Sequence, residues 1–172
     1  MSCKKISILG VTGSVGQSAV DVILCAPEQF DVQLVTAGSN VQKLAENAIN
    51  LKAKKAVIAD EKSYLELKTL LSGTDIKAYG GSQAIEELAS EPCDILLAAI
   101  VGFTGLMPIL SALNKGINVA IANKEPLVAA GSLVIEAAKK TGAKILPVDS
   151  EHNAIFQCFE ESNRHAINKV FL

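Results

Sequence analysis

Arginine is almost absent from this chain of 172 residues: of its 16 basic residues, only Arg164 is an arginine and the others are lysines. Acidic residues number 18, so the formal net charge is −2 at pH 7. Such a chain lacks the stripe of cations that neutralises nucleic-acid phosphates and the guanidinium groups that read base edges. Nucleic acid is therefore not an expected partner.

Long apolar runs are missing as well. The longest, residues 95–101, is much shorter than the roughly 20 residues that cross a bilayer. The apolar stretch near the N-terminus, residues 6–9, is shorter than the about 7 to 15 residues of a secretory signal. We therefore expect no membrane association and a cytoplasmic location.

Cysteines are few and widely spaced. The four of them, Cys3, Cys25, Cys93 and Cys158, are separated by 22, 68 and 65 positions. This spacing fits neither a zinc site nor a dense disulfide framework, so we expect reduced thiols that mostly pack inside the protein. With 49% hydrophobic and 20% charged residues, the chain can bury a core of one domain, with the start of a second.

Short apolar runs of β type alternate with segments of helical period along nearly the whole sequence. This alternation is typical of repeated βα units around a parallel sheet. Several runs are almost wholly apolar, as in strands that helices cover on both faces. We predict strands at residues 5–9, 32–37, 55–59, 76–79, 95–100, 118–121 and 143–148.

Apolar residues at helical spacing lie between these strands. The stripes that we expect to face the core are residues 15, 19, 22 and 23, then 41, 44, 45, 48 and 49, then 67, 70 and 71, and finally 127, 130, 134, 135 and 138. Residues 168–172 look like the opening of another strand with no continuation. We interpret this as a sign that the sequence is a piece of a longer protein.

A glycine-rich loop, GVTGSVG at residues 10–16, directly follows the first predicted strand and opens a helix. Such a junction aims free backbone N–H groups and the positive end of the helix dipole at one spot, and glycines let a pyrophosphate approach closely. Its place at the first βα junction favours dinucleotide binding. Alternatively, the glycines only permit close packing of helix and strand.

The second predicted strand runs into TAGSN, residues 36–40, without the carboxylate that holds the ribose 2′-hydroxyl in a typical NAD site. Ser39 and Asn40 offer neutral hydrogen bonds, and Lys43 lies a few residues on. A 2′-phosphate would not be repelled here, so NADP is favoured over NAD. Ser39 or Asn40 could also simply cap the following helix.

A second polar junction, ANKEP at residues 122–126, follows the strand that ends at residue 121. Asn123 fits a helix N-cap and Pro126 fits a first helical turn. Lys124 opposes the helix dipole, which is tolerated where the lysine faces an anionic or carbonyl ligand. The open alternative is a solvated lysine.

A third junction, PVDSEHNAIF at residues 147–156, places Asp149 and Glu151 two positions apart. In an extended segment both side chains point to the same side, and such oxygen ligands suit Mg²⁺ or Mn²⁺. Alternatively, Asp149 or Ser150 caps a helix and Glu151 lies in its first turn. All three junctions lie where an open α/β sheet binds ligands, so we expect one continuous crevice.

Together the three motifs, GVTGSVG, ANKE and PVDSEHNAIFQ at residues 147–157, closely resemble the 1-deoxy-D-xylulose 5-phosphate reductoisomerase family. The last is the most specific, and Pro126 departs from the Ser or Thr common in the family. The resemblance implies an α/β fold: a Rossmann-like, doubly wound, mostly parallel sheet with helices on both faces. It also implies an NADPH-binding domain at residues 1–148 and a truncated start of the catalytic domain at residues 149–172.

The resemblance further implies an enzyme that rearranges 1-deoxy-D-xylulose 5-phosphate and reduces the product with NADPH to 2-C-methyl-D-erythritol 4-phosphate, a step of isoprenoid precursor synthesis. Carried over motif by motif, the expected cofactor-binding residues are Thr12, Gly13, Ser14, Val15, Gly38, Ser39, Asn40, Asn123 and Glu125. The expected substrate-binding residues are Lys124, Ser150 and Glu151, the expected metal ligands are Asp149 and Glu151, and the expected catalytic set is Lys124, Asp149 and Glu151.

Two other functions stay open at this stage. One is a different NADP-dependent reductase on the same fold, without metal or isomerisation, because a fold alone does not choose a chemistry. The other is a nucleotide-sensing module in which Lys124, Asp149 and Glu151 are solvated and spread apart. For the full-length protein the resemblance suggests a homodimer. The chain by itself is expected to bind NADPH without turning over the sugar phosphate.

Overall fold

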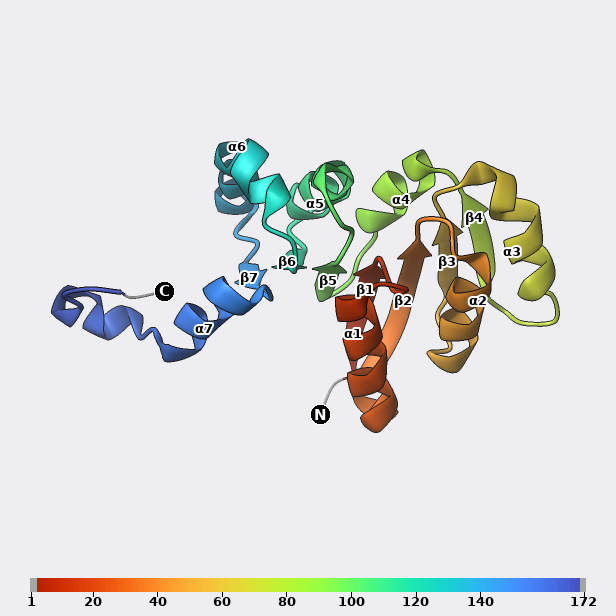
Figure 1. Ribbon diagram of the computed structural model, residues 1–172, viewed down its shortest axis with the longest axis horizontal. Coiled ribbons are helices and arrows are strands. Elements are labelled where there is room, and N and C mark those ends of the chain that lie inside the picture. Colours follow the sequence, from red (N-terminus) through yellow and green to blue (C-terminus); the bar gives the residue numbers. More distant parts are fainter. Residues whose placement is uncertain (1–2, 171–172) are drawn as a thin grey trace.

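The computed structural model describes residues 3–170 and contains one seven-stranded sheet (Figure 1). Every described strand pair is parallel, and the strand order is β4-β3-β2-β1-β5-β6-β7. The strands are β1 (Lys4–Leu9), β2 (Phe30–Ala37), β3 (Lys55–Ile58), β4 (Lys77–Gly80), β5 (Ile95–Ala98), β6 (Asn118–Ile121) and β7 (Ile145–Pro147). The predicted α/β fold is thus confirmed, with a fully parallel sheet among these residues.

Seven α-helices and four short 3₁₀ helices connect and follow the strands in the described part of the chain. The α-helices are α1 (Ser14–Cys25), α2 (Val41–Asn50), α3 (Tyr64–Leu70), α4 (Ser82–Ala89), α5 (Leu106–Leu113), α6 (Glu125–Thr141) and α7 (Ser150–Cys158). The 3₁₀ helices are η1 (Pro27–Gln29), η2 (Glu61–Ser63), η3 (Phe103–Gly105) and η4 (Glu161–Ala166). All seven predicted strands are present, and their ends differ from the predicted ones by at most two residues.

Two hydrophobic cores lie on the two faces of the sheet, because successive strand residues point to opposite sides. In β1, Ile8 packs into the core that also contains residues of α1, α2 and α3, whereas Leu9 packs into the core with α4, α5 and α6. Figure 1 shows α4, α5 and α6 in a row on one side and α1 and α2 on the other. Helices therefore cover both faces, as predicted.

The direction of winding reverses beside β1. The chain builds outward from β1 through β2 and β3 to β4, then returns to pair β5 with the other side of β1. In an open α/β sheet, the crevice outside the carboxyl ends of the strands at such a reversal is the usual ligand site. The glycine-rich loop follows β1 directly, so the topology places it at this crevice.

Three residues of the predicted stripes are exposed instead of buried: Val22, Ile49 and Ile135. Each lies at the margin of its stripe, where helical geometry turns the side chain toward solvent. The prediction for the cysteines is also partly wrong. All four are free, as expected, but Cys3, Cys25 and Cys158 are exposed, and only Cys93 is half-buried. Burial raises the pKa of the Cys93 thiol.

The C-terminal segment differs from the prediction. Beyond η4, residues 167–170 form no strand, and residues 171–172 of the predicted strand opening lie outside the described residues. From α7 onward the chain extends away from the sheet, and most of its side chains are exposed (Figure 1). Among residues 3–170, no helix is both long enough and apolar enough to span a membrane.

Lys52 ends α2 in a left-handed conformation, with φ of 50°. The turn around it is a Schellman motif: the Lys52 amide donates to the Ile49 carbonyl at 3.0 Å and the Ala53 amide donates to the Ala48 carbonyl at 2.9 Å. Glycine is the residue that normally occupies this position, since a Cβ atom makes left-handed backbone costly.

We therefore expect Lys52→Gly to raise the free energy of unfolding by about 0.5–1 kcal/mol, measured by urea denaturation. Lys52→Ala is the matched control, because it removes the side chain but keeps the Cβ atom that causes the strain. A Lys52→Gly chain no more stable than Lys52→Ala would show that the left-handed turn carries no strain.

Candidate dinucleotide and metal site

The loop between β1 and α1 is held by hydrogen bonds from both sides. The amides of Gly10 and Val11 donate to the Thr36 carbonyl at 3.1 and 2.8 Å, and the Gly13 amide donates to the Gly10 carbonyl at 3.1 Å. From α1, the Gln17 side-chain amide donates to the Val11 carbonyl at 2.8 Å. Hydrogen bonds within the protein therefore define the path of the loop.

Two of the three glycines in this loop are required by packing. Gly10 has φ of +84°, and a Cβ atom there would lie 2.5 Å from the carbonyl oxygen of Ala99 beyond β5. A Cβ atom at Gly16 would lie 2.3 Å from the Gly10 carbonyl oxygen. At Gly13 the nearest such contact is an ordinary 3.5 Å. Gly10 and Gly16 are thus needed for close packing, which was the alternative interpretation of the motif. Gly13 is not, and it lies at the cavity.

The first turn of α1 offers unpartnered donors. Gly13 is the N-cap residue and has no side chain to accept a hydrogen bond, and the first turn contains no acidic residue. Among residues 3–170, no acceptor receives the amides of Ser14, Val15 and Gly16. A helix start with free N–H groups and a positive dipole end binds anions, which suits the phosphates of a dinucleotide.

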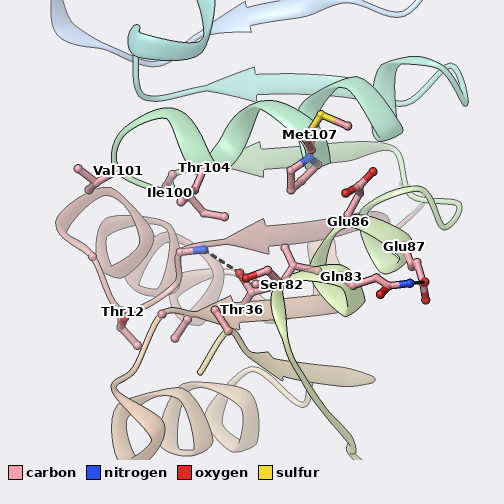
Figure 2. Close-up of a pocket in the computed structure, with 18 residues that line it drawn as sticks. Thr12, Thr36, Ser82, Gln83, Glu86, Glu87, Ile100, Val101, Thr104 and Met107 are labelled. Atoms are coloured by element: carbon pink, nitrogen blue, oxygen red, sulfur yellow. Dashed lines mark hydrogen bonds between the residues drawn. The ribbon is translucent and has the colours of Figure 1, made fainter. Parts of the chain in front are cut away.

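A cavity of about 980 Å³ lies at the carboxyl ends of the strands, next to this loop (Figure 2). Three predicted cofactor-binding residues line it: Thr12, Gly13 and Gly38. Its volume and its position at the winding reversal fit a dinucleotide. Ser39 is exposed and is not part of the lining, and the same is true of Asn40, whose side chain accepts the Lys43 amide at 3.1 Å as the N-cap of α2.

Several residues of this cavity were missed by the sequence reasoning. They come from α4 and from the segment after β5, and they include Ser82, Gln83, Glu86, Ile100, Val101, Thr104 and Met107, all labelled in Figure 2. None belongs to a recognisable motif, because α4 reaches the site only through the strand order of the sheet. The hydrogen bond from the Gln17 side chain to the loop was missed for a similar reason, because a single glutamine in a helix is not part of any sequence motif.

Asn123 was predicted as a helix cap, and this is wrong. Lys124 is the N-cap residue of α6, without a side-chain hydrogen bond, while the Asn123 side-chain amide donates to the Ile100 carbonyl. Asn123 therefore ties the end of β6 to the segment after β5, and Ile100 in turn lines the cavity. Pro126 lies in the first turn of α6, as predicted.

Asp149 is the N-cap of α7. One of its carboxylate oxygens, Oδ1, accepts the His152 amide at 3.0 Å and lies 2.7 Å from the His152 ring Nδ1. The helix begins at Ser150, so the segment is not extended, and Glu151 lies exposed in the first turn. Asp149 thus caps a helix, which was the alternative to an extended segment. A metal ion shared by Asp149 and Glu151 would therefore lie at the start of α7.

The electrostatics connect Asp149 with the neighbouring junction. Partial burial raises the pKa of the Asp149 carboxyl, but the backbone N–H and ring of His152 and the charges of His152 and Lys124 outweigh it, so that the pKa lies below its ordinary value. Lys124 therefore lies near enough to influence this carboxylate. Lys124 itself is exposed.

The crevice is not continuous among the described residues. The large cavity does not include Asn123, Lys124 or Asp149. Asp149 instead borders a smaller pocket of about 360 Å³, whose other lining residues are His152 and seven apolar ones. The predicted residues thus gather in two neighbouring groups along one edge of the sheet, linked by the bond from Asn123 to Ile100.

The described residues offer a metal ion only part of a coordination shell. Residues 3–170 contain no group of three or more His, Cys, Asp or Glu side chains that could hold one. Asp149 and Glu151 supply two carboxylates, and the second oxygen of Asp149, Oδ2, accepts no hydrogen bond within the described residues. Their chemistry fits a hard cation that takes its remaining ligands from elsewhere.

A parallel sheet with a glycine-rich loop at its winding reversal, next to a large cavity, is the arrangement typical of dinucleotide-binding α/β proteins. The family model described as 1-deoxy-D-xylulose 5-phosphate reductoisomerase matches residues 6–131, and the model of that enzyme's C-terminal domain matches residues 145–172. The chain belongs to the 1-deoxy-D-xylulose 5-phosphate reductoisomerase family.

Curated relatives and solved structures agree with this assignment. The chain is 48% identical over 169 residues to the reductoisomerase of Paracoccus denitrificans, with 97% of this chain and 43% of the relative covered. It is 46% identical over 171 residues to that of Allorhizobium ampelinum, with 98% and 43% covered. The chain thus spans less than half the length of these curated relatives.

The structure is similar to that of the Zymomonas mobilis reductoisomerase in complex with NADPH, with a TM-score of 0.92 and 46% identity over 95% of this chain and 43% of the other. A reductoisomerase complex with NADPH, fosmidomycin and magnesium gives a TM-score of 0.88 and 40% identity over 94% and 40%. A biliverdin reductase from Synechocystis shares only the fold, at 18% identity and a TM-score of 0.58.

The lowered pKa of Asp149 allows a direct test of the cap. An ionised Asp149 stabilises α7 at pH values above the ordinary pKa of 3.8, and this contribution is lost as the pH falls through the lowered pKa of the folded chain. Titration of the Asp149 carboxyl carbon by NMR should therefore give a midpoint below 3.8.

In the same titration His152→Ala should move the midpoint part of the way back, since the backbone N–H remains, and Lys124→Met should move it less. His165→Ala, in the exposed 3₁₀ helix η4, is the control and should leave the midpoint unchanged. A midpoint at the ordinary value in the unmodified chain would contradict the cap.

Proposed function

We propose that the protein to which this chain belongs is an NADPH-dependent and divalent-metal-dependent enzyme that converts 1-deoxy-D-xylulose 5-phosphate into 2-C-methyl-D-erythritol 4-phosphate. This chain contributes the NADPH site and the first carboxylates of the metal site. The observation that carries the proposal is the cavity at the winding reversal, lined by Thr12 and Gly13, which come directly before the amides of Ser14, Val15 and Gly16 that have no acceptor among residues 3–170. The NADPH and magnesium complexes of similar enzymes support it.

In this proposal the diphosphate of NADPH lies against Thr12, Gly13 and the first turn of α1. The 2′-phosphate lies near Gly38 and Ser39, beyond the end of β2, and residues 36–40 carry no carboxylate. The Asn40 Oδ1 is used in capping, so the group that Asn40 offers to the cofactor is its side-chain amide nitrogen. We assign Asn123 and Glu125 to the nicotinamide side of the site although neither lines the large cavity, because the Asn123 side chain holds the carbonyl of Ile100, a residue of the lining.

The sugar phosphate would be held by Lys124, Ser150 and Glu151, and Mg²⁺ or Mn²⁺ by Asp149 and Glu151. A bound divalent cation acts as a Lewis acid on the substrate oxygens during the rearrangement of the carbon skeleton. The charge of Lys124, which already influences Asp149, suits an anionic substrate bound between the two junctions. We therefore assign this edge of the sheet the function of binding the sugar phosphate and the cation next to each other.

The remaining parts of the proposal rest on the family. They are a role in isoprenoid precursor synthesis, a cytoplasmic homodimer for the full-length protein, and a division into an NADPH-binding domain at residues 1–148 and the start of a catalytic domain at residues 149–172. The two family models, which match residues 6–131 and 145–172, support a division near this position. The alternative, an NADP-dependent reductase without metal or isomerisation, would leave Asp149 with a capping role alone.

The cofactor part of the proposal predicts that this chain binds NADPH more tightly than NADH, by more than about tenfold or about 1.4 kcal/mol. The reason is the neutral end of β2, where Ser39 can donate to a phosphate. Isothermal titration of the chain with both cofactors measures the ratio. Equal or reversed affinities would contradict the assignment of NADP.

The same titrated chain is expected not to oxidise NADPH with substrate and Mn²⁺, because two carboxylates leave a hard cation under-ligated. The full-length protein, assayed under the same conditions, should oxidise NADPH only when 1-deoxy-D-xylulose 5-phosphate and the metal are both present. Activity of the full-length protein without added metal, in the presence of a chelator, would favour the alternative reductase.

The metal part is tested by Asp149→Asn in the full-length protein. Asparagine caps a helix as well as aspartate does, so α7 should keep its start while the carboxylate is lost. We expect turnover to fall on the order of 100-fold or more, with little change in NADPH affinity, because the metal acts on the substrate.

Asp94→Asn is the matched control. The Asp94 carboxylate accepts the Lys5 amide at 2.8 Å just before β5, at the amino edge of the sheet, and asparagine can accept the same bond. Its turnover should equal that of the unmodified protein. Normal turnover in Asp149→Asn would remove Asp149 from the metal site.

A further inference from the structure

Thr36 is placed unusually for a strand residue. It lies next to the end of β2, is 1% exposed, and still lines the large cavity (Figure 2). Its hydroxyl oxygen accepts the Gly10 amide at 3.1 Å, and the Thr36 carbonyl accepts the same amide at 3.1 Å. Thr36 thus touches the glycine-rich loop through both its backbone and its side chain.

Among residues 3–170, the hydroxyl proton of Thr36 has no acceptor. A threonine hydroxyl is one donor and two acceptor positions, and the only hydrogen bond of this hydroxyl uses it as an acceptor. No other described residue accepts from it. A buried donor without a partner costs free energy, so a polar group at the cavity is expected to complete it.

We propose that the Thr36 hydroxyl is a further cofactor-binding group, which donates a hydrogen bond to an oxygen of the adenosine diphosphate half of the dinucleotide. This proposal rests on the proposed function, because it takes the cavity to be the NADPH site. Thr36 lies between the loop that faces the diphosphate and Gly38, which follows β2 by one residue. The oxygen that it contacts therefore belongs to the part that NADPH and NADH share.

The decisive variant is Thr36→Val, which keeps the shape of the side chain and removes the hydroxyl. We expect it to weaken binding of NADPH and NADH by the same factor, about fivefold, by isothermal titration. Thr36→Ser keeps the hydroxyl and should restore most of the affinity. Ser39→Ala, by contrast, should weaken NADPH binding alone.

Amide hydrogen exchange of Gly10 in the chain without cofactor distinguishes a hydroxyl that only holds the loop from one that contacts the cofactor. The Thr36 carbonyl still accepts this amide in Thr36→Val, so its protection should stay close to that of the unmodified chain. Thr69→Val is the matched control, since the Thr69 hydroxyl bonds to the Leu65 carbonyl within α3, outside the cavity lining. It should bind both cofactors normally.

Unchanged affinity in Thr36→Val would overturn the proposal, as would a Thr36→Ser chain as weak as Thr36→Val. Weaker binding that accompanies loss of Gly10 protection would also overturn it, because the hydroxyl would then act on the loop rather than on the ligand. If the unmodified chain binds neither cofactor, the proposed function fails as well. If it binds NADPH and Thr36→Val binds equally well, only the inference fails.

Discussion

The site depends on one constraint, the close contact of the glycine-rich loop after β1 with the ends of β2 and β5 on either side. Gly10 packs so tightly beyond the end of β5 that a Cβ atom would lie 2.5 Å from the Ala99 carbonyl oxygen. On its other side, Thr36 of β2 accepts the amides of Gly10 and Val11. These contacts hold the loop at the winding reversal, and α1 consequently starts with its free amides beside the cavity.

Residues along this edge of the sheet often serve the fold before they serve a ligand. Asn40 and Asp149 cap helices, and Asn123 ties two strand ends together through the Ile100 carbonyl. Such bonds fix the orientation of each side chain. They use only some of its polar atoms, and the remainder stays available to other partners. For Asp149 that remainder is the oxygen Oδ2, which accepts no hydrogen bond within the described residues. Structural and ligand-binding roles are therefore compatible at one residue.

The described residues form most of the proposed NADPH site but only part of the proposed metal site. The cavity of about 980 Å³ that we assign to the cofactor is lined by β2, α4 and α5 and by the loops that follow β1, β3 and β5. The proposed metal ligands instead lie at the start of α7, Asp149 as its half-buried N-cap and Glu151 exposed in its first turn. The proposed dinucleotide site thus lies against the core of the sheet, whereas the proposed metal site needs ligands besides Asp149 and Glu151.

The sequence by itself determined the fold class, the seven strands and the three polar junctions, because apolar periodicity and the glycine run are local signals. It left open whether Asp149 lies in an extended segment or caps a helix, and it misplaced the cap of α6 at Asn123. Only the tertiary structure decided which junctions share a cavity, and it brought Gln83 and Met107 to the large cavity beside the glycine-rich loop. The physical reason is that strand order and helix packing are long-range, so side chains distant in sequence meet without any local pattern.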